Sequence, residues 1–269
     1  MRSIFITLIF LFPIAAFADY ESAYKAYSNG EYEQALPEFL QLANEGHLKA
    51  QFYLGAMYRE GLGVEQDYAE SLKWYEKSAE QGEPKAMHNV ALFYHNGIAV
   101  ERDISTAITW YEKAAVLDYI ESQQNLALLY YKGDGVKENI DEAIKWWQKA
   151  ADLGGERAQN NLGLMYILGE GVPKDNDKAL YWYRKSAEQG FAESQNSIGV
   201  IYHEGQGVEK DWVEAYAWFK LAESNGHEMA KLNVAIVESK LSEDELKSAM
   251  EKYESYKELY VKKKENNKK

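Results

Sequence analysis

A tryptophan returns every 36 residues in this chain, and that period constrains the fold more than any other feature. The pairs that contain it are Trp74-Tyr75, Trp110-Tyr111, Trp146-Trp147, Trp182-Tyr183 and Trp218-Phe219. A fixed period of this length indicates a repeat fold, in which each unit buries its apolar face only against its neighbours. The register predicts five repeats without insertions, at residues 47–82, 83–118, 119–154, 155–190 and 191–226.

Each repeat has the pattern of two helices. In the first copy, Ala50, Leu54 and Met57 recur at spacings of three and four, which is the helical period. They predict a first helix, helix A, over residues 48–59. A Gly-Leu-Gly loop at residues 61–63 follows it, and glycine suits such a loop because it readily adopts positive φ.

The second helix, helix B, has capping signals at both ends. Asp67 is a typical N-cap, and Glu70 three residues later has the spacing of a capping box. Gly82 is a typical C-cap residue. The later copies repeat these positions as the caps Asp103, Asn139, Asp175 and Asp211, the acids Glu142 and Glu214, and the glycines Gly154, Gly190 and Gly226, with Asp118 in place of one glycine.

Small residues on helix A are paired with aromatic residues on helix B. A glycine or alanine allows a neighbouring helix to come close, and the aromatic rings of helix B then fill the gaps between repeats. Burial of such a ring contributes several kcal/mol at roughly 25 cal/mol per Å². The small residues are Gly55, Ala91, Ala127, Gly163 and Gly199.

The ends of the chain depart from the repeat. Residues 19–46 predict a shorter capping pair, similar to a tetratricopeptide unit, and Pro37 is expected to kink its second helix. Residues 227–261 predict C-terminal capping helices, the second of which begins with a capping box at Ser242 and Glu245. Residues 262–269 predict a basic, disordered tail.

The first 18 residues have the pattern of a secretory signal peptide. A basic start is followed by the apolar run 4–14 and by the small-residue site Ala16-Phe17-Ala18. The alternative is a membrane anchor, but the run is short and polar residues follow it directly. The chain has no cysteine, so disulfides and a lipid-modified cysteine are excluded. These features favour the bacterial periplasm, with an extracellular location as the alternative.

No sequence pattern indicates catalysis, a metal or a cofactor. The formal charge of −13 argues against nucleic-acid binding, which needs a basic face. His88 and His95 are seven residues apart, about 10 Å along a helix, which is too far for one metal ion. The repeated glycine pairs lack the lysine of a phosphate-binding loop. We therefore predict a non-enzymatic protein without cofactors.

The repeats resemble the Sel1-like repeat family, relatives of tetratricopeptide repeats with a longer loop. The resemblance rests on the Leu-Gly-x-Met-Tyr motif at residues 54–58, the Gly-x-Gly-Val loop and the Trp-Tyr helix, and it covers about residues 20–250. It implies an all-α fold, a right-handed α-α superhelix or solenoid, with an adaptor or regulatory role. Some cysteine-rich members are similar to β-lactam-binding proteins, but their paired cysteines are absent here.

In such a superhelix helix A lines the concave face, and the variable positions of helix A are candidates for partner binding. They fall at i, i+4 and i+7, which places them on one helix face. They form an apolar row with polar and aromatic flanks, which suits an extended peptide or a helix. Alternatively, each is simply solvated or half-packed. The candidates are Phe52, Ala56, Arg59, His88, Leu92, His95, Gln124, Leu128, Tyr131, Asn160, Leu164, Ile167, Asn196, Val200 and His203.

The function that follows is a scaffold or adaptor of the bacterial envelope that binds a partner protein or peptide. A regulator of envelope signalling or assembly is one form of this role. The alternative is a secreted factor that acts on host proteins, and a β-lactam or cell-wall hydrolase ranks behind both. The sequence leaves open the identity of the partner and whether the C-terminal helix mediates self-association.

Overall fold

The computed structural model describes the backbone of residues 19–266 and the side chains of residues 19–260. The predicted signal peptide, residues 1–18, lies outside this part of the chain. The described residues form fourteen α-helices and no strand, as the repeat pattern predicts. Contacts among the described residues define two compact units, which divide between residues 90 and 91, inside helix α5.

The first unit holds the N-terminal helix pair, the first repeat and the start of the second repeat. Pro37 lies inside α2, which continues without a break from Tyr32 to Asn44, and the kink at Pro37 stays a prediction. Phe39, Leu54, Met57 and Trp74 form the centre of the core of this unit. The helices are α1 (Tyr20–Ser28), α2 (Tyr32–Asn44), α3 (Leu48–Glu60), α4 (Tyr68–Glu80) and the first part of α5 (Pro84–Asn96).

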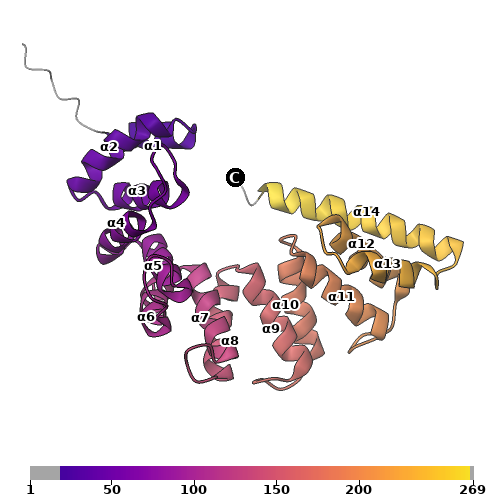
Figure 1. Ribbon diagram of the computed structural model, residues 1–269. Coiled ribbons are helices and arrows are strands. Elements are labelled where there is room, and N and C mark those ends of the chain that lie inside the picture. Colours follow the sequence, from indigo (N-terminus) through magenta and orange to yellow (C-terminus); the bar gives the residue numbers. More distant parts are fainter. Residues whose placement is uncertain (1–18, 267–269) are drawn as a thin grey trace, which may run out of the picture. The chain divides into compact units, whose positions relative to one another are not determined.

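The second unit holds the remaining repeats and the C-terminal helices. Figure 1 shows α7 to α12 following one another side by side in chain order, and consecutive helices are in contact. The helices of this unit after α5 are α6 (Ile104–Ala115), α7 (Ile120–Lys132), α8 (Ile140–Asp152), α9 (Glu156–Leu168), α10 (Asn176–Ala187), α11 (Ala192–Glu204), α12 (Trp212–Ser224), α13 (Ala230–Glu238) and α14 (Glu243–Asn266).

The two helices of a repeat touch through the predicted small residues. A Cβ atom added to Gly163 would lie 2.8 Å from the ring of Tyr183, closer than real Cβ contacts allow. Gly55 is equally close to Tyr75. Tyr75 and Tyr183 are 1% and 4% exposed, so the glycine is what allows each ring to be buried. The stack is an α-α solenoid held by these ring contacts.

The loop after helix A needs positive φ at two positions. Gly61 ends α3 with φ 71°, and Gly63 follows with φ 68°. The second repeat has Ala99 at the second position, where it adopts φ 59°. A left-handed conformation costs a residue with a Cβ about 1–2 kcal/mol, so this repeat carries strain that its neighbours lack.

The predicted N-caps are present, but the predicted capping boxes of helix B are incomplete. The Asp67 carboxylate accepts from the backbone N–H of Ala69 and Glu70, at 2.9 and 3.0 Å. The Glu70 side chain does not reach back to the cap, because it forms an ion pair with Lys73 at 2.7 Å. Glu142 is held by Lys145 in the same way. Glu214 instead binds Lys252 and Tyr256 of α14.

The C-terminal helix α14 lies along α12 (Figure 1) and makes its principal contacts with it. Its start has the predicted capping box, in which Ser242 donates its N–H to Glu245 at 2.8 Å and accepts from the Glu245 N–H. The helix continues to Asn266, so residues 262–266 do not form the predicted disordered tail. Lysine and glutamate are good helix formers, and no glycine or proline interrupts this segment.

Candidate functional site

The variable positions of helix A lie at the surface, whereas the framework positions between them are buried. None of the fifteen candidate residues is fully buried, and Leu128 and Leu164 are 40% and 37% exposed. The framework leucines Leu126 and Leu162, two residues before them, are 0% and 1% exposed. Helix A therefore has one face inside the stack and another that is accessible to a partner. We call the accessible side the helix A face.

In the first unit the helix A face is built from Phe52, Ala56, Arg59 and His88. The Arg59 guanidinium donates to the side-chain oxygens of Glu60 at 2.7 Å and Asn89 at 3.1 Å. Burial, assisted by the positive charge of Arg59, lowers the pKa of His88 to about 4. This imidazole is therefore neutral at physiological pH and acts as a polar, uncharged group.

At the start of the second unit, His95 lies within a charged cluster. Its Nε2 is 4.0 Å from the carboxylate of Asp134, which accepts two hydrogen bonds from Arg102, at 2.8 and 3.0 Å. Arg102 also donates from Nε to the His95 carbonyl at 3.0 Å. Burial lowers the pKa of His95, although the Asp134 carboxylate opposes the shift. The hydrogen bond from Arg102 holds the pKa of the Asp134 carboxyl below its usual range.

An apolar row runs along the helix A face of the second unit, one residue from each helix A. Leu92 and Val200 are half-buried and pack on the cores beneath them, while Leu128 and Leu164 stand out. Tyr131 flanks the row, with its ring centroid 5.3 Å from that of Trp147 and its hydroxyl 3.3 Å from the Glu170 carboxylate. The members of the apolar row are Leu92, Leu128, Leu164 and Val200.

Two of the polar candidates are engaged with the next helix A. The Asn160 side-chain oxygen accepts from the Ser194 hydroxyl at 2.8 Å, and that of Asn196 accepts from the Asn233 amide at 2.8 Å. Gln124 packs over Gly155, where an added Cβ would lie 2.7 Å from its amide nitrogen. These residues therefore join successive repeats in addition to facing outward.

Sequence reasoning missed a row of buried glutamines one position before these residues. Each donates its amide to a carbonyl in the last turn of the preceding helix B, at 2.9 to 3.1 Å. The signal was present, since the glutamine recurs at the 36-residue period with Met87 as the exception. We call these residues the glutamine row: Gln51, Gln123, Gln159 and Gln195.

A second residue completes this contact in three repeats. Gln81 donates to the side-chain oxygen of Gln51 at 2.6 Å, and the same bond joins Gln189 to Gln159 and Asn225 to Gln195, both at 2.9 Å. The third repeat has Leu153 at this position, and the Gln123 side-chain oxygen is buried without a partner. The glutamine row therefore has one incomplete member.

In the part of the chain that the structure describes, no three His, Asp or Glu side chains are grouped to hold a metal ion. None of the described helices combines the length and apolar character needed to cross a membrane.

The family model for the Sel1 repeat matches residues 48–83, 84–119, 120–155, 156–191 and 192–227. The chain belongs to the Sel1 repeat family. The matched segments have the 36-residue spacing of the predicted repeats and begin one residue later. Sel1 repeat proteins generally mediate protein–protein interactions and generally have no catalytic activity.

Two solved structures show the same fold. A Sel1 repeat protein from Oxalobacter formigenes is 32% identical, with a TM-score of 0.75 over 79% of this chain and 87% of the other. A protective antigen present in uropathogenic Escherichia coli strains is 31% identical, with a TM-score of 0.57 over 91% of this chain and 61% of the other. None of the curated proteins matches this Sel1 repeat chain.

Proposed function

We propose that this Sel1 repeat protein is a non-enzymatic adaptor of the bacterial envelope that binds a partner protein or peptide on its helix A face. The observation that carries the proposal is the exposure of Leu128 and Leu164, 40% and 37%, at equivalent positions of consecutive repeats. Full burial of a leucine contributes about 1.5–3 kcal/mol, so leaving both partly exposed gives up stability. A partner that covers them recovers it.

The surroundings of the row favour a partner with an apolar stripe and polar edges. The half-buried Tyr131 offers a hydroxyl and a ring beside Leu128, and Arg102 and Asp134 offer both charges near its start. Because the two charges are paired, the row has no strong preference for an acidic or a basic partner. An amphipathic helix or an extended peptide has the required pattern.

The envelope location rests on the signal-peptide pattern of residues 1–18. The likeness to a protective antigen of uropathogenic Escherichia coli favours a place outside the cytoplasm and also suits the second candidate, a secreted factor acting on host proteins. Fractionation separates the two: release by osmotic shock supports the periplasmic adaptor, and accumulation in the culture medium supports the secreted factor.

The helix A face is tested by placing a photoreactive amino acid at position 131, whose tyrosine flanks the apolar row, in the living cell. We expect a discrete crosslinked complex there and none from the same probe at position 117, since Leu117 is 50% exposed, follows the C-cap of α6 and is not a member of the row. Leu128→Glu with Leu164→Glu should abolish the complex without loss of helicity, while Leu117→Glu should leave it intact. A complex that survives the double substitution would refute the helix A face as the binding surface.

A further inference from the structure

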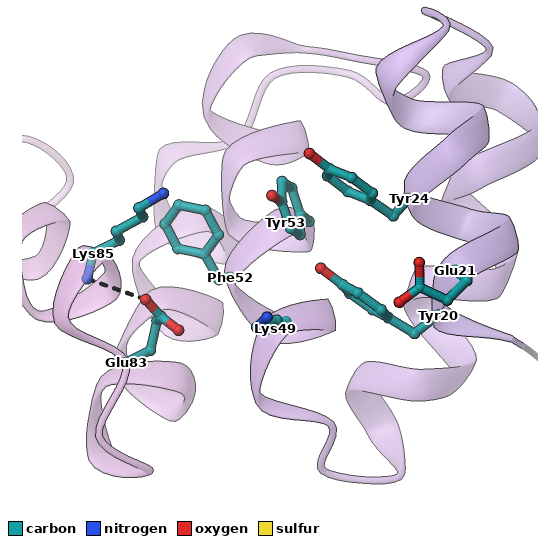
Figure 2. A pocket seen from close by; sticks show the side chains of 8 residues that line it. All are labelled: Tyr20, Glu21, Tyr24, Lys49, Phe52, Tyr53, Glu83 and Lys85. Carbon is teal, nitrogen blue, oxygen red and sulfur yellow. Dashed lines mark hydrogen bonds between the residues drawn. The ribbon is translucent and has the colours of Figure 1, made fainter. Parts of the chain in front are cut away.

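A hollow of about 430 Å³ opens in the first unit, lined by residues of three helices (Figure 2). This volume is within the range of about 300–1,000 Å³ found for ligand sites. Only Phe52 belongs to the predicted partner-binding residues, so the hollow is a separate feature of the molecule. Its lining residues are Tyr20, Glu21 and Tyr24 on α1, Lys49, Phe52 and Tyr53 on α3, and Glu83 and Lys85 where α5 begins.

Four aromatic rings stand around this hollow, and packing fixes their positions. Tyr53 stacks on the fully buried Phe39, with ring centroids 5.6 Å apart. Tyr24 and Phe52 lie against Tyr53 with centroids 5.3 Å apart in each case and with interplanar angles of 53° and 77°. Tyr20 lies nearly parallel to Tyr24, at 10°, so the notches of this surface lie where Tyr53 is tilted against Tyr24 and Phe52. Tyr24 is nevertheless 39% exposed, so a large apolar surface faces the solvent.

The polar groups of the hollow are donors on balance and carry no net charge. The Lys49 and Lys85 ammonium groups are balanced by Glu21 and Glu83 (Figure 2). The three tyrosines add hydroxyls, and burial raises the pKa of Tyr20 and Tyr53, so these hydroxyls stay protonated. The site therefore suits an uncharged ligand with compact apolar rings and free carbonyl acceptors.

We propose that this hollow binds a proline-rich segment of a partner in the polyproline II conformation. Proline rings fit between tilted aromatic rings, and the conformation has no internal hydrogen bonds, so its carbonyls are free to accept from tyrosine and lysine. The segment loses little entropy on binding because it is already extended. A saccharide would stack its face on a single ring and is the competing ligand in the test.

The test is a fluorescence-anisotropy titration of the full chain with fluorescein-labelled decaproline, against a glycine-serine peptide of the same length. We expect saturable binding of decaproline alone. Tyr24→Ala should weaken it roughly fivefold, which is the loss of one aromatic contact. Tyr68→Ala is the matched control, since Tyr68 is 42% exposed on α4 outside the hollow, and it should bind as the wild type does.

Three outcomes overturn the proposal: no saturable binding of decaproline, equal binding by Tyr24→Ala, or binding of a chito-oligosaccharide in place of the peptide. If Tyr24→Ala fails to fold, decaproline bearing a benzophenone is crosslinked to the wild type. Labelling within α1 or α3 supports the site, and labelling elsewhere overturns it. The Leu128→Glu, Leu164→Glu variant should bind decaproline normally, which separates this test from that of the helix A face.

Discussion

The incomplete member of the glutamine row predicts that Leu153→Gln stabilises the protein. The Gln123 side chain is 0% exposed, and its oxygen has no hydrogen-bond partner. Leu153 lies at the position from which Gln81 and Gln189 donate to their glutamines in other repeats. Its backbone at the end of α8, φ −81° and ψ 0°, matches that of Gln81 at the end of α4, φ −85° and ψ −2°. A glutamine placed there would reach the oxygen without rearrangement.

The gain is estimated from the two groups that change. Satisfying a buried acceptor recovers about 1–3 kcal/mol. Leu153 is 43% exposed, and a glutamine retains apolar carbons at Cβ and Cγ, so the lost apolar burial is about 1 kcal/mol or less. The expected net gain is about 1 kcal/mol in the free energy of unfolding. For a chain of this size that corresponds to a rise of about 2–4 °C in Tm.

The assay is urea unfolding followed by circular dichroism and tryptophan fluorescence. Leu117→Gln is the matched control, because Leu117 has the same place in the second repeat, where Met87 replaces the acceptor glutamine. Leu117→Gln should leave the free energy of unfolding unchanged. Introducing Gln123→Met should also remove the effect of Leu153→Gln, a coupling that a double-mutant cycle measures. If Leu153→Gln leaves the unfolding midpoint unchanged, or if Leu117→Gln raises it equally, the reasoning from the unsatisfied oxygen is wrong.

Three further predictions concern strain, packing and protonation. Urea unfolding should show that Ala99→Gly raises the free energy of unfolding by up to about 1 kcal/mol, because φ 59° strains alanine. Asp118→Gly should raise it by less, since aspartate tolerates its φ of 60° better. Gly163→Ala should lower the free energy of unfolding by about 1–3 kcal/mol, because the new Cβ would lie 2.8 Å from the Tyr183 ring. This cost outweighs the higher helix propensity of alanine. An unchanged Tm would contradict the close approach of Gly163 and Tyr183. The pKa of His88 is about 4 in the folded chain, so as pH falls below about 6.5 the unfolded chain takes up a proton that the folded chain does not. The free energy of unfolding should therefore decrease between about pH 6.5 and pH 4. A series of thermal melts should show that His88→Gln flattens this slope.

The secondary structure was predictable because its determinants are local and repeated five times. The glutamates at the third position of helix B were predicted to complete capping boxes, but they form ion pairs, and the sequence held a signal for this. Glu70 and Glu142 are each followed three residues later by a lysine, which captures the carboxylate. Glu245 is followed at that spacing by Ser248, and it completes its capping box. The spacing of the acid alone was insufficient, because a cation on the same helix face competes with the backbone N–H groups.

The aromatic hollow could not be predicted, because its rings come from separate helices. Tyr20 and Tyr24 share one face of α1 by their spacing, and this much is readable from the sequence. This face meets Tyr53 of α3 only because α1 and α2 fold back at the end of the stack. The short turn at Asn29 and Gly30 moves α1 out of the 36-residue register, although α2 keeps it, so the repeat gave no guide to the contacts of α1.

The helix A face of the second unit holds two kinds of residue at different positions. Asn160 and Asn196 bind Ser194 and Asn233 of the next helix A, so these polar candidates contribute to the joints between repeats. Leu128 and Leu164 lie one turn away from such positions, and their 40% and 37% exposure leaves surface that the stack does not use. Under the proposed function, stability and recognition depend on different residues of one face, so the leucines are free to vary with the partner while the asparagines are constrained by the solenoid. Recognition by this protein is therefore expected to depend on the apolar row more than on its polar edge.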